Sequence, residues 1–196
     1  MSRVASFAAI ILGCTAAVGT VLAEEAPKNS AAAGKLLQAA DAARQARNYA
    51  ECVSKAKEAN GVAAKNAYDS FTINSLLMAC YAGQNNVAEA VPYMEQVIDS
   101  PYQQAAAKLP ILKYLMSYAY TSKNYEKAIA YGERVRSAGD TSEDTAVLIA
   151  QSYYLLGKYK EAMAGMDAII ARAEQAGKKP SEKGLNVVWS LSLIHI

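Results

Sequence analysis

A helix–turn–helix pattern that recurs along the chain is the feature that most constrains its fold. Residues 143–170 are expected to form two short helices around one tight turn, because apolar residues recur at helical spacing on both sides of it. The same pattern occurs 34 residues earlier, with Tyr125 in the place of Tyr159. Ala128 likewise takes the place of Ala162. The recurrence predicts a stack of helix pairs.

The pattern predicts four helix pairs between residues 34 and 178. The expected helices are 34–47 with 49–59, 66–82 with 86–98, and two further pairs around the turns at 122–124 and 157–159. By this pattern Pro92 lies inside a helix, where it should kink the helix or delay its start. Residues 103–110 are expected to be an insertion, with Pro110 in the first turn of the next helix.

Small residues occupy one aligned position in every second helix. These residues are Cys52, Ala90, Ala128 and Ala162. We expect them to let the two helices of a pair approach closely, while tyrosines three residues earlier (Tyr49, Tyr125 and Tyr159) wedge the turn. Leu36, Ala39, Ala40 and Ala43 are the expected core face of the first helix. Gly132 is expected either at a close helix crossing or at a neutral surface position.

This combination of residues resembles the tetratricopeptide repeat family. The resemblance covers about residues 34–170 and is strongest in the last two units, although Ala40, Met78, Met116 and Ala150 stand where the family has a glycine. It implies an all-α fold, a right-handed α-solenoid of stacked antiparallel helix pairs. It also implies that the first helices line a concave face that binds a protein or peptide.

Polar and aromatic residues beside the core stripe of the first helices are the candidates for partner contact. The positions follow i, i+4, i+7 and are Leu37, Asp41 and Arg44; Ser75, Ala79 and Ala82; Lys113, Ser117 and Tyr120; and Val147, Gln151 and Tyr154. The partner-binding candidates among them are Lys113, Tyr120, Gln151, Tyr154, Asp41 and Arg44. Because Leu37, Ser75 and Val147 stand where a peptide-carboxylate clamp needs polar groups, that activity is not expected.

The composition argues against several other classes of function. The formal net charge is only +2, from 20 basic and 18 acidic residues, so no nucleic-acid partner is expected. Three cysteines and one histidine offer little for metal or nucleophilic chemistry, and no CxxC, HExxH, GxSxG or phosphate-loop pattern occurs. We therefore predict no catalytic residues, no metal, no cofactor and no small-molecule substrate.

The first 23 residues have the features of a secretory signal peptide. Arg3 precedes an apolar run, and small residues end with Ala23 at the expected cleavage site. Residues 24–33 are expected to be a flexible lead-in. Periplasmic or other exported localisation follows, with membrane contact only through this signal or through lipid on Cys14, whose surroundings loosely resemble a bacterial lipobox.

Cys52 and Cys80 are a candidate disulfide. They fall on the second helix of one unit and the first helix of the next, which are neighbours in a solenoid. An oxidising compartment would allow the bond. Two small buried thiols are the alternative.

The C-terminal end has two predicted parts. Residues 179–190 are expected to begin a fifth unit. Residues 191–196 match the translated start of a transposase adapter used in sequencing libraries, so we expect them, with His195, to be an artefact on a truncated chain.

The sequence thus favours a non-catalytic interaction scaffold or adaptor in the bacterial cell envelope, binding a peptide or helix in its concave groove. Two alternatives stay open. One is the docking region of a larger envelope enzyme whose catalytic domain lies beyond the truncation. The other is a lipid-anchored outer-membrane assembly factor.

Overall fold

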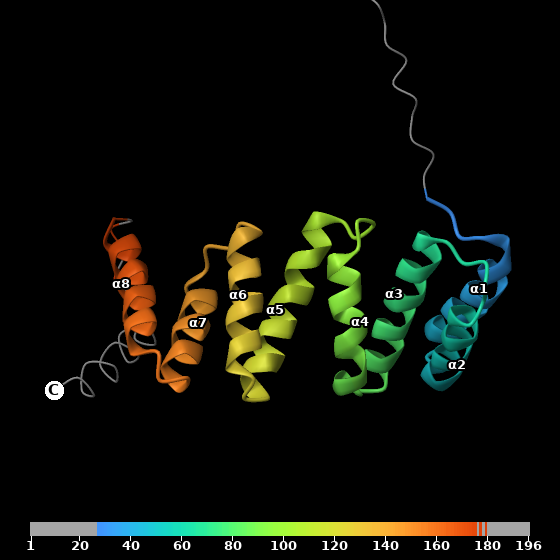
Figure 1. Cartoon of the computed structure of the whole chain (residues 1–196), viewed down its shortest axis with the longest axis horizontal. Helices are drawn as coiled ribbons and strands as arrows, with labels where there is room; N and C mark the ends of the chain where they lie inside the picture. The colour runs from blue at the N-terminus through green and yellow to red at the C-terminus, as the bar shows by residue number, and fades with distance from the viewer. Residues whose placement is uncertain (1–26, 176, 178, 180–196) are drawn as a thin grey trace, which may run out of the picture.

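The computed structural model describes residues 27–175, 177 and 179, and these form eight α-helices stacked side by side (Figure 1). The helices are α1 (Ala31–Gln45), α2 (Tyr49–Asn60), α3 (Ala67–Gly83), α4 (Val87–Asp99), α5 (Ala105–Thr121), α6 (Tyr125–Ser137), α7 (Glu143–Leu155) and α8 (Tyr159–Gln175). Consecutive helices pack as antiparallel pairs, so the predicted all-α solenoid is confirmed. The predicted signal peptide, Cys14, the fifth unit after Lys179 and residues 191–196 lie outside the described residues.

The turn between the two helices of each pair contains one residue in the left-handed conformation. The same backbone hydrogen bond follows that residue in all four turns. Arg47, Asn85, Lys123 and Gly157 have φ values of 59°, 58°, 60° and 72°. The amide of the next residue then donates back to a carbonyl five residues earlier, as Asn124 N does to Ala119 O at 2.8 Å. This bond satisfies a carbonyl that the helix end leaves open. The four turns are therefore equivalent, although their sequences differ.

The aligned small residues of the second helices lie at the centre of each pair. Cys52, Ala90, Ala128 and Ala162 are all 0% exposed, which confirms the predicted close approach. At the first turn, Tyr49 packs so tightly over Gly83 that a Cβ there would lie 2.5 Å from its ring.

The structure corrects two predictions about helix starts and one about the core. Helix α5 begins at Ala105, so Pro110 lies inside the helix and the predicted insertion is mostly helical. Helix α4 begins at Val87 and continues through Pro92 without a delayed start. Ala39 is exposed, because α1 turns Leu37 into the core instead.

The segment before α1 is fastened to α3 by the carboxylate of Asp69. This side chain is fully buried and accepts hydrogen bonds from the backbone N–H groups of Ser30 (2.9 Å) and Asn66 (2.8 Å). Burial alone would raise the pKa of Asp69, but these hydrogen bonds outweigh it and hold the pKa below its usual value. The predicted lead-in therefore gives way to ordered structure before residue 33, since α1 begins at Ala31.

The joints that follow the first and third pairs are held in different ways. Cys52 of α2 and Cys80 of α3 form a disulfide with Cα atoms 6.2 Å apart. Between α6 and α7, Gly132 faces Ile149, and a Cβ on the glycine would lie 2.5 Å from Ile149 Cγ1. The prediction that Gly132 marks a close helix crossing is confirmed.

Candidate binding surface

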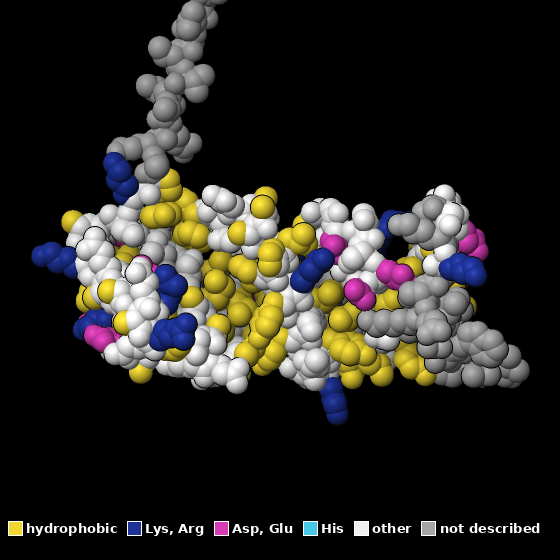
Figure 2. All heavy atoms as spheres, turned by 180° about the vertical axis from the view of Figure 1, so that it is seen from behind, with side chains coloured by type: hydrophobic (Ala, Val, Ile, Leu, Met, Phe, Trp, Pro, Cys, Tyr) yellow, Lys and Arg dark blue, Asp and Glu magenta, His cyan; other side chains and the backbone are white. Residues whose placement is uncertain are grey.

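The first helices of the four pairs present a continuous side of the molecule, seen in Figure 2. The residues 18, 14, 11 and 7 places before the aligned small residue of each pair are spaced i, i+4, i+7 and i+11, so they share one side of their helix, and all but Leu76 are exposed or half-buried. We call them the first-helix face: Gly34, Gln38, Asp41 and Gln45 of α1; Thr72, Leu76, Ala79 and Gly83 of α3; Pro110, Tyr114, Ser117 and Thr121 of α5; and Asp144, Leu148, Gln151 and Leu155 of α7.

Apolar side chains gather over the middle of this face (Figure 2). Among the described residues, Tyr114 and Leu155 are the large apolar side chains that remain exposed, at 44% and 47%. Both belong to the first-helix face. The predicted stripe shares Ser117 and Gln151 with this face, but it took Lys113 and Tyr154 in place of their neighbours Tyr114 and Leu155.

Two predicted groove positions are almost fully buried. Leu37 is 3% exposed, and Val147 is 1% exposed where it packs with Ala162 and Met166 of α8. The apolar pattern alone does not show which of these residues face the neighbouring second helix.

A groove of about 1020 Å³ runs between α1 and α3 on this side. Leu37, Leu76 and Ala79 contribute apolar walls. The polar side chains along it are Lys35, Gln38, Asp41, Arg44, Gln45, Thr72 and Ser75. Such a mixture of apolar surface and hydrogen-bonding groups suits a peptide.

The predicted candidates Asp41 and Arg44 lie together in this groove. Arg44 Nε donates to Asp41 Oδ1 at 2.8 Å, and Gln45 Nε2 donates to Oδ2 at 2.6 Å. The hydrogen bond from Arg44 is the main cause that lowers the pKa of Asp41. The pair therefore presents an ordered, charged hydrogen-bonding surface on α1.

The candidate Lys113 is held at the joint between the third and fourth pairs. Its Nζ lies 2.7 Å from Asp140 Oδ1 in the turn before α7. Burial would raise the pKa of Asp140, but hydrogen bonds from Lys113, Ser142 and Thr145 lower it to about 2. Lys113 therefore fixes this turn.

The two predicted tyrosines pack across the turns of their own pairs. The rings of Tyr120 and Tyr125 lie 5.8 Å apart, and those of Tyr154 and Tyr159 lie 5.6 Å apart. Gln151 is the remaining candidate and is half-buried on the first-helix face. The six candidates are thus spread along three of the first helices rather than brought to one point.

The joint between the second and third pairs depends on side chains of the second helices. Although α1 approaches α3 closely, no Cα atom of α3 lies within 8 Å of one in α5. Lys127 and Tyr131 of α6 both donate to Glu95 Oε1 of α4, the first at 2.9 Å. Arg134 and Asp99 add a third bond between the two helices, an ion pair at 2.6 Å. These polar contacts add to a thinner helix packing, which at this joint lies between α4 and α5.

We expect Glu95→Gln to lower the free energy of unfolding by about 1 kcal/mol at neutral pH. Burial would raise the pKa of Glu95, but hydrogen bonds from Tyr131 and Lys127 hold it below its ordinary value. The stabilisation is therefore present above the ordinary pKa and is lost as the pH falls through the lowered one. Urea unfolding from pH 7 to pH 3 measures the difference between variant and wild type.

Glu133→Gln is the matched control for Glu95→Gln. Glu133 makes an exposed ion pair with Arg136 one turn along the same helix, so its loss should cost about 0.3 kcal/mol. Equal effects of the two substitutions would show that the α4–α6 contact does not hold the joint.

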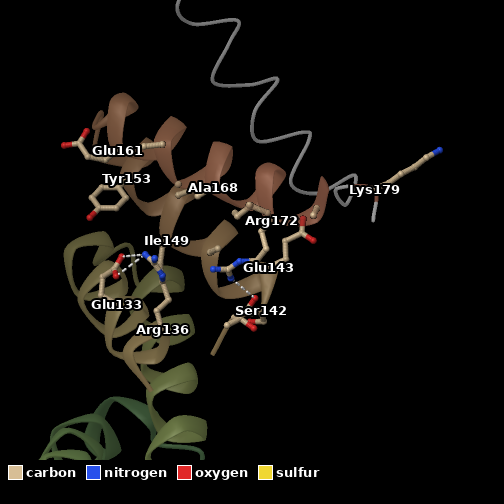
Figure 3. A pocket seen from close by; sticks show the side chains of 17 residues that line it. Glu133, Arg136, Ser142, Glu143, Ile149, Tyr153, Glu161, Ala168, Arg172 and Lys179 are labelled. Carbon is tan, nitrogen blue, oxygen red and sulfur yellow. Dashed lines mark hydrogen bonds and ion pairs between the residues drawn. The ribbon is translucent and has the colours of Figure 1, made fainter. Parts of the chain in front are cut away.

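A second pocket, of about 620 Å³, lies among α6, α7 and α8 (Figure 3). Its lining includes the small or apolar residues Ala146, Ile149, Ala150, Ala164, Gly165, Ala168 and Ile169. At the end that carries Glu143, Arg172 donates to the carbonyl of Thr141 at 3.5 Å, while Tyr153 and Glu161 lie at the other end (Figure 3).

Within the described residues, no group of three or more His, Cys, Asp or Glu side chains could hold a metal ion. In the same part of the chain, no helix has the length and apolar character needed to cross a membrane.

A family model described as anaphase-promoting complex, cyclosome, subunit 3 matches residues 121–175, which contain α6, α7 and α8. No curated protein matches the chain. The matched region is the part of the sequence in which the repeat pattern is clearest.

Proposed function

Because the chain is built from tetratricopeptide-type repeats, we propose that it is a non-catalytic interaction scaffold of the bacterial cell envelope. Its first-helix face binds a peptide or helix of another protein. Repeats of this family generally mediate binding between proteins, which supports the proposal. The exposure of Tyr114 and Leu155 on one face is the observation that carries it.

The chemistry of this face suits a polypeptide partner. Tyrosine provides a large, rigid contact area and is common among residues that dominate binding energy. Beside Tyr114 on α5, the face offers the small polar side chains of Ser117 and Thr121, which leave backbone and side-chain atoms of a partner within reach. An extended or helical segment can lie across several first helices at once.

Two features support localisation in the envelope. The sequence of residues 1–23 has the charge and apolar pattern of an export signal. The disulfide between Cys52 and Cys80 is a bond that persists in oxidising compartments.

Site-specific photo-crosslinking in cells tests the proposed face. We expect p-benzoylphenylalanine at Tyr114 or Gln151 to give a discrete adduct with a partner protein. The same group at Lys160, an exposed position on α8 outside this face, should give none. Adducts at Lys160 but not at Tyr114 or Gln151 would show that the partner binds another side of the molecule.

A further inference from the structure

The contact between α4 and α6 shows how a tyrosine can be held between two successive second helices. Tyr131 of α6 donates its hydroxyl to Glu95 of α4, and Lys127 donates to the same oxygen. Arg134 and Asp99 form an ion pair beside them. Tyr131 is only 7% exposed, so its ring is almost fully enclosed by this contact.

The pocket among α6, α7 and α8 lies at the aligned place one pair later. Counted from the aligned small residue of each second helix, Glu95, Lys127, Tyr131 and Arg134 correspond to Glu133, Glu161, Gly165 and Ala168. All four of the aligned residues line the pocket of about 620 Å³. The carboxylate of the earlier helix is therefore kept, whereas the tyrosine that would reach it is a glycine and the arginine is an alanine.

The walls of this pocket suit an aromatic ring. Ile149 and Ala150 of α7 line it and are 5% and 1% exposed. A Cβ built on Gly165 would meet Ala150 Cβ at 3.7 Å, an ordinary contact. In Figure 3, Glu133 and Glu161 stand on the two sides of the pocket, on α6 and α8, at the end that carries Tyr153. A second ring can pack there against the ring of Tyr153.

The polar groups of the pocket favour an uncharged hydrogen-bond donor. Arg136 Nη1 donates to both oxygens of Glu133, at 3.1 and 3.2 Å, which compensates the charge of the carboxylate. A carboxylate has about four acceptor sites, so Glu133 can accept a further donor. A cationic side chain would meet Arg136 and Arg172 in the same lining, and an anionic one would meet Glu133 and Glu161. The hydroxyl of a tyrosine avoids both kinds of repulsion.

We propose that this pocket binds a tyrosine side chain of a partner polypeptide, whose hydroxyl donates to Glu133 as that of Tyr131 donates to Glu95. A volume of about 620 Å³ is within the range that encloses drug-sized ligands, so the peptide groups beside the tyrosine fit as well. The pocket thus selects for a tyrosine within a chain.

The site is separate from the surface of the proposed function. No residue of the first-helix face lines this pocket. Lys160 is also outside it, because five helical residues place Lys160 about 140° around α8 from Gly165. The chain therefore has a second binding surface, formed largely by its last two second helices.

Methyl NMR of the full chain with N-acetyl-tyrosinamide tests the site. This probe represents a tyrosine within a polypeptide, because both of its ends are amides. It should shift the methyl signals of Ile149 and Ala150 and saturate with a Kd of about 1 mM. N-acetyl-phenylalaninamide has no hydroxyl to donate to Glu133, so its Kd should be about fivefold higher.

Two variants with matched controls test the assigned contacts. Gly165→Tyr places a ring where Tyr131 stands in α6 and should weaken binding of N-acetyl-tyrosinamide at least about tenfold, with unchanged helix content by circular dichroism. Gly165→Ala, which adds only the Cβ, should bind as the wild type does. Glu133→Leu should make the affinities for the two amides equal. Asp167→Leu removes the carboxylate at the aligned position of α8, outside the pocket, and should keep the difference.

Four results would overturn the inference. They are no shift at Ile149 and Ala150 up to about 10 mM probe, equal affinities for the two amides in the wild type, undiminished binding to Gly165→Tyr, and tighter binding of N-acetyl-lysinamide. Tighter binding of free tyrosine than of its amide would instead assign the pocket to an amino acid and would overturn the polypeptide partner. None of these results bears on the first-helix face, which the crosslinking at Tyr114 and Gln151 tests.

Discussion

Replacing Cys52 and Cys80 together by alanine should lower the free energy of unfolding by about 3.5 kcal/mol. The disulfide closes a loop of 28 residues, and its loss gives the unfolded chain more freedom. Alanine should fit without strain, because Ala90, Ala128 and Ala162 occupy the position of Cys52 in the other pairs with no exposure. Urea unfolding followed by circular dichroism measures the loss.

Reduction provides the control for the cysteine variant. A thiol reductant in the unfolding buffer should bring the wild type close to the stability of the double variant and leave that variant unchanged. A wild type whose stability is the same with and without reductant would show that the bond does not hold the first joint.

The second large effect is expected for Gly132→Ala, which should destabilise the chain by about 2 kcal/mol. Alanine favours a helix by about 1 kcal/mol over glycine, so the clash at the α6–α7 crossing has to outweigh that gain. A Cβ would lie 2.5 Å from Ile149 Cγ1 and 3.2 Å from Met116 Sδ. Because isoleucine is branched at Cβ, Cγ1 cannot move aside without a change of rotamer.

Gly165→Ala is the matched control for the steric argument. Gly165 is also a helical glycine, in α8 of the fourth pair. Its added Cβ would meet Ala150 Cβ at 3.7 Å, which is an ordinary contact. This substitution should therefore stabilise the chain by about 1 kcal/mol. If both alanine variants are stabilised, the close crossing at Gly132 does not constrain the helix.

The sequence predicted the helix pairs because small and aromatic residues recur at fixed positions around each turn. The complete burial of Ala90 and Ala128 follows directly from that pattern. The rotation of the first helices was harder to predict, since α1 is rich in alanine and its stripe is ambiguous. Leu37 therefore lies in the observed core, whereas Ala39, which the pattern placed there, is exposed.

The candidate site was predictable as a face but not residue by residue. Lys113 and Tyr120 are polar residues beside the core stripe, and no local pattern shows that one pairs with Asp140 or that the other packs against Tyr125. These contacts join residues of different elements, so they depend on how the helices stack. Tyr114 could have been found only from the true rotation of α5.

Hydrogen–deuterium exchange of the full chain, with and without a crosslinking-identified partner, is the most direct test of the central claim that the first helices carry the binding face. The account predicts that the partner slows exchange in α1, α3, α5 and α7 and in the turns that follow them, with little change in α4 and α6. Protection confined to α2, α4, α6 and α8 would contradict it.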